Sequence, residues 1–220
     1  CWRQFLGTYS SSSPVLDPEF PILYVSGSDG VYAVDIGGEC GAPAGRILWH
    51  YAAKMGITNV ALGKDGRNIY FGTLDSRVIS LHARKAAVGI NATVSENWSY
   101  GVNGDLILSS PVVRGDETVF ITTSNGMVYA FNGSYISSSS PTTPSQTFTS
   151  EEENTTPKLL LWSFETNTED PIYASPVMGP NNTLLIASSS GELLTVSDSE
   201  PSVMAPVFIT KVSKTTDLTT

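Results

Sequence analysis

One segment pattern recurs four times along this chain of 220 residues. Each copy is an apolar run, a tight turn and a second apolar run, as in Leu23–Asp35 and Val119–Asn132. The other two copies cover residues 69–82 and 184–198, and the four turns are built on Gly30, Ser76, Gly126 and Gly191. Repetition of this kind is typical of stacked structural units, so the pattern predicts an array of similar sheets.

Each unit can be divided into four short strands, which we call a to d. Strand a carries Ser-Pro-Val, strands b and c flank the turn, and strand d carries a tryptophan with an aromatic residue two positions later. Ser-Pro-Val occurs at residues 13–15, 110–112 and 175–177, and it is degenerate at 59–61. Short strands separated by regular turn signals, without helical periodicity, predict an all-β fold.

These motifs resemble the quinoprotein-type (PQQ-like) β-propeller repeat, and the resemblance covers residues 1–198. The Gly-His and Trp-Asp pairs of WD40 repeats are absent. The resemblance implies a β-propeller with about four visible four-stranded antiparallel blades, incomplete or part of a larger propeller. It also implies that one tryptophan per blade packs against the neighbouring blade: Trp2, Trp49, Trp98 and Trp162.

The blade count predicts an incomplete array. Residues 2–5 resemble a lone strand d, the fourth unit lacks its tryptophan, and the Ser/Thr/Pro-rich insert 135–157 is expected to be mobile. The tail 199–220 is polar, with one apolar stretch at 203–212 that is a candidate for a further strand. Three explanations stay open: a processed or excerpted piece of a longer propeller, completion by another copy, or an open array whose edges pair with another chain.

Charge and composition argue against several classes of function. The net charge is −9 with only 12 Lys and Arg, which excludes nucleic acid as the expected partner. No apolar run could span a membrane, so membrane contact is expected only through a segment outside this chain. We expect no cofactor, no metal and no catalysis. Quinoprotein dehydrogenases have an adjacent pair of cysteines and a Ca²⁺ site, whereas this chain has no adjacent cysteines and no Asp, Asn or Glu group that stands out as a Ca²⁺ shell. The two histidines, His50 and His82, are too few for a metal site.

Five Asn-x-Ser/Thr sequons predict N-glycosylation and a secreted, cell-surface or secretory-lumen location in a eukaryote. Chance sequons in a bacterial periplasmic protein are the alternative. Strand order places all five on the face that carries the a–b and c–d loops: Asn91, Asn97, Asn132, Asn154 and Asn181. The two cysteines, Cys1 and Cys40, map to the same face and predict one disulfide, unless Cys1 pairs with a segment elsewhere.

The opposite face carries the b–c turns and is predicted to be acidic and free of sequons. Its candidate partner-binding residues are Asp29, Asp75, Asn125 and Asp105, although Asp and Asn before Gly are also ordinary hairpin residues. We therefore predict a non-catalytic glycoprotein scaffold for protein–protein interaction or self-association, through this face or through open blade edges. The alternatives are the ectodomain of a receptor or lumenal stress sensor, a subunit of an extracellular fibre, and a fragment of a PQQ-dependent dehydrogenase.

Overall fold

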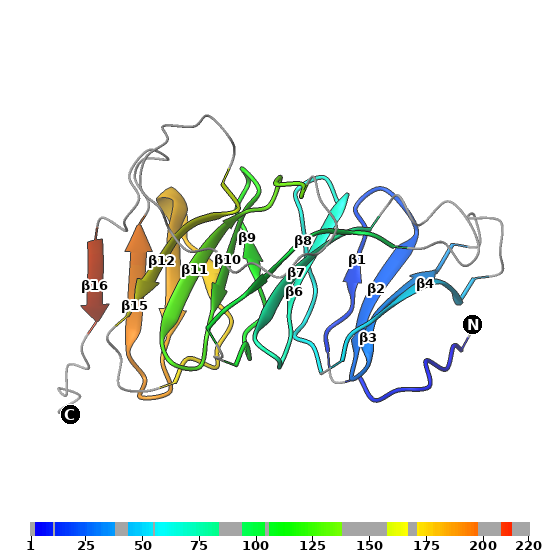
Figure 1. The fold of residues 1–220 in the computed structure, drawn as a ribbon, viewed down its shortest axis with the longest axis horizontal. Coiled ribbons are helices and arrows are strands. Elements are labelled where there is room, and N and C mark those ends of the chain that lie inside the picture. The colour runs from blue at the N-terminus through cyan, green and yellow to red at the C-terminus, as the bar shows by residue number, and fades with distance from the viewer. Residues whose placement is uncertain are drawn as a thin grey trace, which may run out of the picture.

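The protein folds into four antiparallel four-stranded sheets, each formed by strands that are consecutive in the sequence (Figure 1). The computed structural model describes residues 3–10, 12–37, 44–54, 56–83, 94–103, 106–137, 158–166, 171–197 and 208–212. Within these ranges the one helical element is the 3-10 turn η2 (Pro180–Asn182). The all-β fold predicted from the repeat is confirmed.

The first two sheets, blades 1 and 2, follow the predicted a-b-c-d order. Blade 1 contains β1 (Val15–Leu16), β2 (Ile22–Gly27), β3 (Gly30–Asp35) and β4 (Arg46–Ala52). Blade 2 contains β5 (Ala61–Leu62), β6 (Asn68–Gly72), β7 (Arg77–His82) and β8 (Glu96–Gly101).

Blades 3 and 4 repeat this arrangement. Blade 3 contains β9 (Val112–Val113), β10 (Thr118–Thr122), β11 (Met127–Asn132) and β12 (Leu160–Glu165). Blade 4 contains β13 (Val177–Met178), β14 (Thr183–Ala187), β15 (Leu193–Ser197) and β16 (Phe208–Val212).

The b–c turns form where the sequence predicts them, because each needs one residue with a positive φ. Gly30, Ser76, Gly126 and Gly191 have φ values of 146°, 65°, 85° and 85°. This conformation costs an L-residue energy and costs glycine little, so three of the four turns use glycine.

The hydrophobic core lies between the blades, in three clusters that join blade 1 to 2, 2 to 3 and 3 to 4. Successive side chains of a strand point to opposite faces, so every inner blade contributes to two clusters. The predicted blade-packing residues Trp49, Trp98 and Trp162 are 3%, 3% and 7% exposed and lie in these clusters, while Trp2 lies outside the described residues.

Each of these tryptophans lies near an aromatic residue of strand b in its own blade. The ring centroids are 5.9 Å apart for Tyr24–Trp49, 6.0 Å for Tyr70–Trp98 and 5.8 Å for Phe120–Trp162. A small residue of strand c lies between each pair in the register: Ala33, Ser80 and Ala130.

The two ends of the array compare differently with the prediction. Arg3–Phe5 belong to no strand, so the lone strand d expected at residues 2–5 is not found in its described part. Strand d of blade 4 comes from the tail, because β16 pairs with β15 along Phe208–Val212, within the stretch 203–212 that was a candidate for a further strand. Blade 4 therefore extends beyond the predicted boundary at residue 198 and is completed by its own chain.

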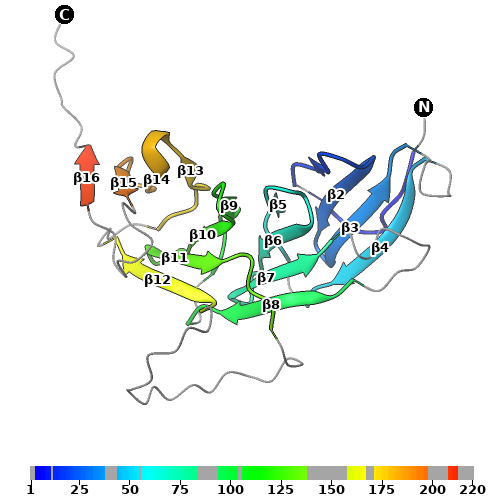
Figure 2. The same ribbon diagram turned by 90° about the horizontal axis from the view of Figure 1, so that it is seen from above.

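The four sheets follow an arc that is open on one side (Figure 2). The d strands β4, β8 and β12 lie on its outer side, and the short a strands lie toward the inside, where β5 contacts β9. The chain therefore forms a partial propeller with blade 1 at one end and blade 4 at the other.

Candidate functional site

The b–c rim of the propeller carries the predicted partner-binding residues. We define this rim as the four b–c turns together with the connections that accept a backbone hydrogen bond from them. The same bond occurs four times, at 2.9, 2.9, 2.9 and 3.1 Å: Ser28 N to Tyr9 O, Leu74 N to Gly56 O, Ser124 N to Leu106 O and Ser189 N to Pro171 O. Residues 8–10 thus take the place in blade 1 that the connection from strand d of the preceding blade to strand a takes in blades 2 to 4.

The structure places Asp29, Asp75 and Asn125 at equivalent positions on this rim, as predicted, and Asp105 lies outside the described residues. Asp75 and Asn125 are exposed, and Asp29 is half-buried. Asn125 Oδ1 accepts a hydrogen bond from Thr123 Oγ1 at 2.6 Å, which is the local turn chemistry that Asn commonly provides. Asp75 is therefore the predicted residue that presents its side chain most openly.

Asp29 is engaged within blade 1. Tyr32 donates a hydrogen bond from its hydroxyl to Asp29 Oδ2 at 2.7 Å, and His50 Nε2 lies 3.7 Å from the same oxygen. The rings of Tyr32 and His50 stack at 4.2 Å. Burial by itself would raise the pKa of Asp29, but hydrogen bonds from Tyr32 and Thr8 and the charge of His50 outweigh it, so the pKa is lowered.

The hydrogen bond between Tyr32 and Asp29 changes the pKa of Tyr32 in the opposite direction, upward. Burial, and then the hydrogen bond to the Asp29 carboxylate, raise the pKa of Tyr32 to about 12. At neutral pH Tyr32 is thus a neutral donor and Asp29 an ionised acceptor. The cluster fixes the b–c turn of blade 1 and joins it to strand d through His50.

Exposed apolar side chains on the b–c rim were missed by the sequence reasoning. Leu74, Leu106, Leu108 and Tyr173 are 36%, 46%, 38% and 55% exposed, and Tyr9 is 75% exposed. Leu106 and Leu108 flank the fully buried Ile107, which packs into the core between blades 2 and 3. The run Leu106-Ile107-Leu108 was the signal in the sequence that could have found them. When the middle residue of three apolar residues is buried, its two neighbours point toward solvent.

The opposite a–b rim consists of the a–b turns and the c–d connections. The three sequons within the described residues lie on it: Asn97 at the start of β8, Asn132 at the end of β11 and Asn181 in η2. Asn181 is exposed and Asn132 half-buried. Asn91, Asn154, Cys1 and Cys40 lie outside the described residues.

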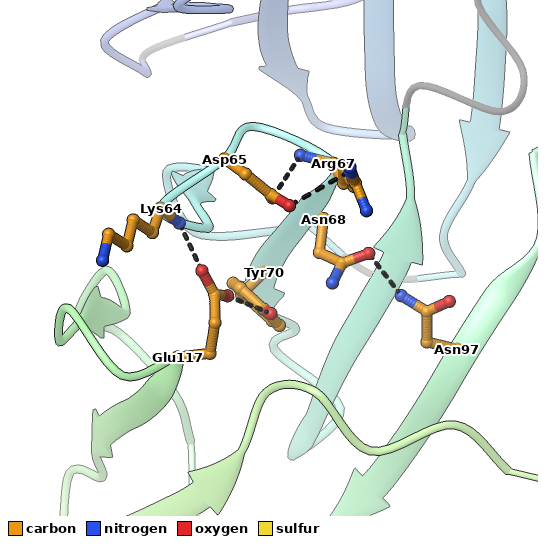
Figure 3. Close-up of polar contacts among 7 residues, drawn as sticks. All are labelled: Lys64, Asp65, Arg67, Asn68, Tyr70, Asn97 and Glu117. Atoms are coloured by element: carbon orange, nitrogen blue, oxygen red, sulfur yellow. Dashed lines mark hydrogen bonds and ion pairs between the residues drawn. The ribbon is translucent and has the colours of Figure 1, made fainter.

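Asn97 is not suited to carry a glycan. Its side chain is only 7% exposed, and its Nδ2 donates to Asn68 Oδ1 at 3.0 Å and to Ser80 Oγ at 3.1 Å (Figure 3 shows the contact with Asn68). A glycan on Nδ2 would remove one of these donors and has no room at this depth. The burial of Asn97 beside Trp98 therefore argues against a glycan at this sequon in the folded chain.

A second polar contact on the a–b rim joins blade 3 to blade 2 (Figure 3). Glu117, in the a–b turn of blade 3, accepts hydrogen bonds from the Tyr70 hydroxyl at 3.0 Å and from the backbone N–H of Lys64. Tyr70 is fully buried and also donates to Gly133 O at 3.1 Å. Burial, and then the charge of Glu117, raise the pKa of Tyr70, so it stays a neutral donor.

The described residues contain no group of three or more His, Cys, Asp or Glu side chains placed to hold a metal ion. They also contain no helix with the length and apolar character needed to cross a membrane.

Comparisons with known proteins were made on sequence and on structure. No protein-family model matches the sequence, and no curated protein matches it. Solved structures do match. BamB from Moraxella catarrhalis superposes with a TM-score of 0.60 at 14% identity, over 94% of this chain and 55% of that chain.

Two other similar structures are WD40-type propellers. The Cps50 (Swd1) β-propeller domain from Myceliophteria thermophila has a TM-score of 0.59 at 12% identity, over 84% of this chain and 52% of that one. Sqt1 from Chaetomium thermophilum was solved bound to the N-terminus of ribosomal protein L10. It has a TM-score of 0.64 at 13% identity, over 90% of this chain and 48% of that one. The chain spans about half the length of these proteins, and at such identities the likeness identifies its fold: this is a β-propeller repeat protein.

Proposed function

We propose that this protein is a non-catalytic, extracellular or lumenal glycoprotein scaffold whose b–c rim binds a partner protein. The observation that carries the proposal is the contrast between the two rims. The b–c rim exposes Leu74, Leu106, Leu108 and Tyr173 as well as the acidic Asp75, whereas every described sequon lies on the a–b rim.

These four apolar side chains belong to consecutive turns and connections of one rim, and neighbouring exposed apolar side chains commonly mark a site of association. Glycans are bulky and hydrated, so a partner would dock more easily on the rim without sequons. Leu74 next to Asp75 suits a partner segment that offers an apolar side chain together with Lys or Arg.

The finer repeat type belongs to the same proposal. The PQQ-like resemblance is supported by the Trp of strand d, which lies between blades in the three described cases, and by the positive-φ residue in each b–c turn. Fold alone assigns no function, so the proposal rests on the surface of the b–c rim rather than on the propeller itself.

A glycan placed on the b–c rim tests the proposal. Leu74→Asn creates a sequon with Asp75 and Ser76 on this rim, and Asp116→Asn creates one with Glu117 and Thr118 on the a–b rim. Both variants are produced in eukaryotic secretory cells, and the proteins that co-purify with each are quantified by mass spectrometry. We expect the partner to be lost with Leu74→Asn and kept with Asp116→Asn.

The double variant Leu74→Asn/Ser76→Ala separates the glycan from the loss of the leucine, because it carries the Asn without a sequon. Co-purification of the same partner with the glycosylated Leu74→Asn protein would refute the assignment of the b–c rim.

A further inference from the structure

We propose that Asn125, in the b–c turn of blade 3, is a site of spontaneous deamidation, at which the folded chain converts its own side-chain amide into a carboxylate. Position 125 then carries the charge that Asp29 and Asp75 carry at the equivalent positions of blades 1 and 2. The inference concerns the chemistry of one turn and does not depend on the proposed function.

Deamidation is an attack of the chain on itself. Gly126 N attacks Asn125 Cγ, the Cγ–Nδ2 bond breaks, and ammonia leaves with the proton that Gly126 N has lost. A water molecule then opens the five-membered succinimide at either carbonyl and leaves aspartate or isoaspartate. Glycine after the asparagine favours the attack, because it has no Cβ to hinder its nitrogen and its backbone rotates easily.

Two Asn-Gly pairs lie wholly within the described residues, and their surroundings differ: Asn125–Gly126 and Asn132–Gly133. A third pair begins at Asn103, but its glycine lies outside the described residues. Glycine follows both described asparagines, so their local sequence ranks them alike. The fold must decide between them, since each turn has to open locally before the nitrogen can swing onto the side chain.

The turn at Asn125 is exposed and is held by bonds within itself. Gly126 N donates to Thr123 O at 3.1 Å, and Thr123 Oγ1 donates to Asn125 Oδ1 at 2.6 Å. Among the described residues, none hydrogen-bonds to the backbone N–H or C=O of Asn125. The peptide group between Asn125 and Gly126 can therefore turn at the loss of one backbone hydrogen bond, while Gly126 O stays bonded to the Thr166 hydroxyl at 2.8 Å.

The turn at Asn132 is half-buried and is tied to other segments. Gly133 N donates to Glu117 O at 2.9 Å, and Gly133 O accepts from the Tyr70 hydroxyl of blade 2 at 3.1 Å. Asn132 N donates to Leu159 O, ahead of β12, at 2.8 Å. A Cβ at Gly133 would clash with Glu117 O and the Tyr70 hydroxyl, so the backbone has no room to move there.

These contacts set the expected rates. Asn132 reacts only after bonds to two other segments and to blade 2 are broken, whereas Asn125 reacts after one exposed turn rearranges. In the folded chain we therefore expect Asn125 to deamidate about 10-fold or more faster than Asn132. In the unfolded chain the two rates should lie within about 3-fold of each other, because glycine follows both asparagines.

The test follows both sites in the unglycosylated 220-residue chain, because a glycan on Asn132 would block its amide. Samples are kept at physiological temperature and mildly alkaline pH, with and without a denaturing concentration of guanidinium chloride. Peptide mapping by mass spectrometry gives the fraction converted, and fragment spectra assign each conversion to its asparagine. The Asn125→Asp chain supplies the reference peptide for the aspartate product.

Asn125→Gln is the matched variant, since a glutamine side chain must close a six-membered ring and reacts far more slowly. It should show no conversion at position 125 and an unchanged rate at Asn132. Three results would overturn the proposal: equal rates at Asn125 and Asn132 in the folded chain, a slowing of Asn125 by folding as large as that of Asn132, or no reaction at Asn125 over the time in which the unfolded chain is fully converted.

Discussion

Replacement of Glu117 tests how the blades are held in register. Glu117 has a φ of 67°, and Gly66 and Asn182 hold the equivalent position in the a–b turns of blades 2 and 4, with φ values of 69° and 58°. Glutamate is thus the least suited of the three residues to this backbone conformation. Its side chain compensates by binding Tyr70 and the Lys64 N–H of the preceding blade.

A net hydrogen bond to a charged group stabilises by about 1.5–3 kcal/mol, and we take about 1.5 kcal/mol for the Tyr70 bond because Glu117 is half-buried. The bond from Lys64 N–H is exposed, so we take about 0.5 kcal/mol for it. Glu117→Ala removes both bonds and should therefore cost about 2 kcal/mol. The Tyr70 hydroxyl is not orphaned, since it still donates to Gly133 O.

Glu117→Gly removes the same bonds but relieves a left-handed strain of about 1–2 kcal/mol, offset by about 0.5–1 kcal/mol of extra glycine entropy in the unfolded chain. It should therefore be about 0.5–1 kcal/mol more stable than Glu117→Ala. Glu117→Gln can accept from Lys64 N–H and donate to the Tyr70 oxygen, so we expect a loss of about 1 kcal/mol or less.

Urea unfolding at pH 7, analysed by linear extrapolation, measures the three free energies of unfolding. The order wild type, Gln, Gly, Ala is the expected result. Glu117→Gly less stable than Glu117→Ala, or Glu117→Ala within about 0.5 kcal/mol of wild type, would refute the reasoning.

Three further predictions concern single positions. Ser76→Gly should stabilise the chain by about 0.5 kcal/mol in the same assay, since Ser76 holds a φ of 65° where Gly126 has 85°, and an equal or lower stability would contradict this. Burial by itself would raise the pKa of Asp116, but hydrogen bonds from Arg114 and Thr118 outweigh it and lower the pKa to about 2. The carboxylate therefore stabilises the fold fully above about pH 4, and this stabilisation is lost as the pH falls through 2. In unglycosylated protein, Asp116→Asn should lower the free energy of unfolding by about 1 kcal/mol or less at pH 7, because the carboxylate is exposed. The difference in stability between wild type and Asp116→Asn should disappear below about pH 2. A difference that does not change with pH would contradict the lowered pKa of Asp116. Glycopeptide mass spectrometry of chain from eukaryotic cells should find no glycan at Asn97, and an occupied Asn97 in folded protein would contradict its burial.

The repeat could be predicted from the sequence because its signals are local. Alternating apolar residues define strands b and c, and the need for a positive φ places each turn at Gly30, Ser76, Gly126 or Gly191. The same local pattern failed at residues 3–5, which have the composition of a strand but pair with none. At the other end, the apolar stretch 203–212 does supply a strand, Phe208–Val212, but it takes the strand d place without a tryptophan.

The site was predicted less completely. Equivalent turn positions placed Asp29, Asp75 and Asn125 on one rim, but the engagement of Asp29 by Tyr32 and His50 depends on side chains that only the folded blade brings together. The exposed Leu106 and Leu108 depend in the same way on Ile107 entering the core between blades 2 and 3.

The sequence by itself determined the repeat unit, the order of its strands and the place of each b–c turn, since these follow from residues close together in the chain. The tertiary structure alone decided which sequon is buried, which acidic side chain is free to meet solvent, and that Glu117 joins blade 3 to Tyr70 across 47 positions of sequence. Such contacts form only when separate blades pack, and the spacing of residues along one strand does not predict which residues of another blade it will contact.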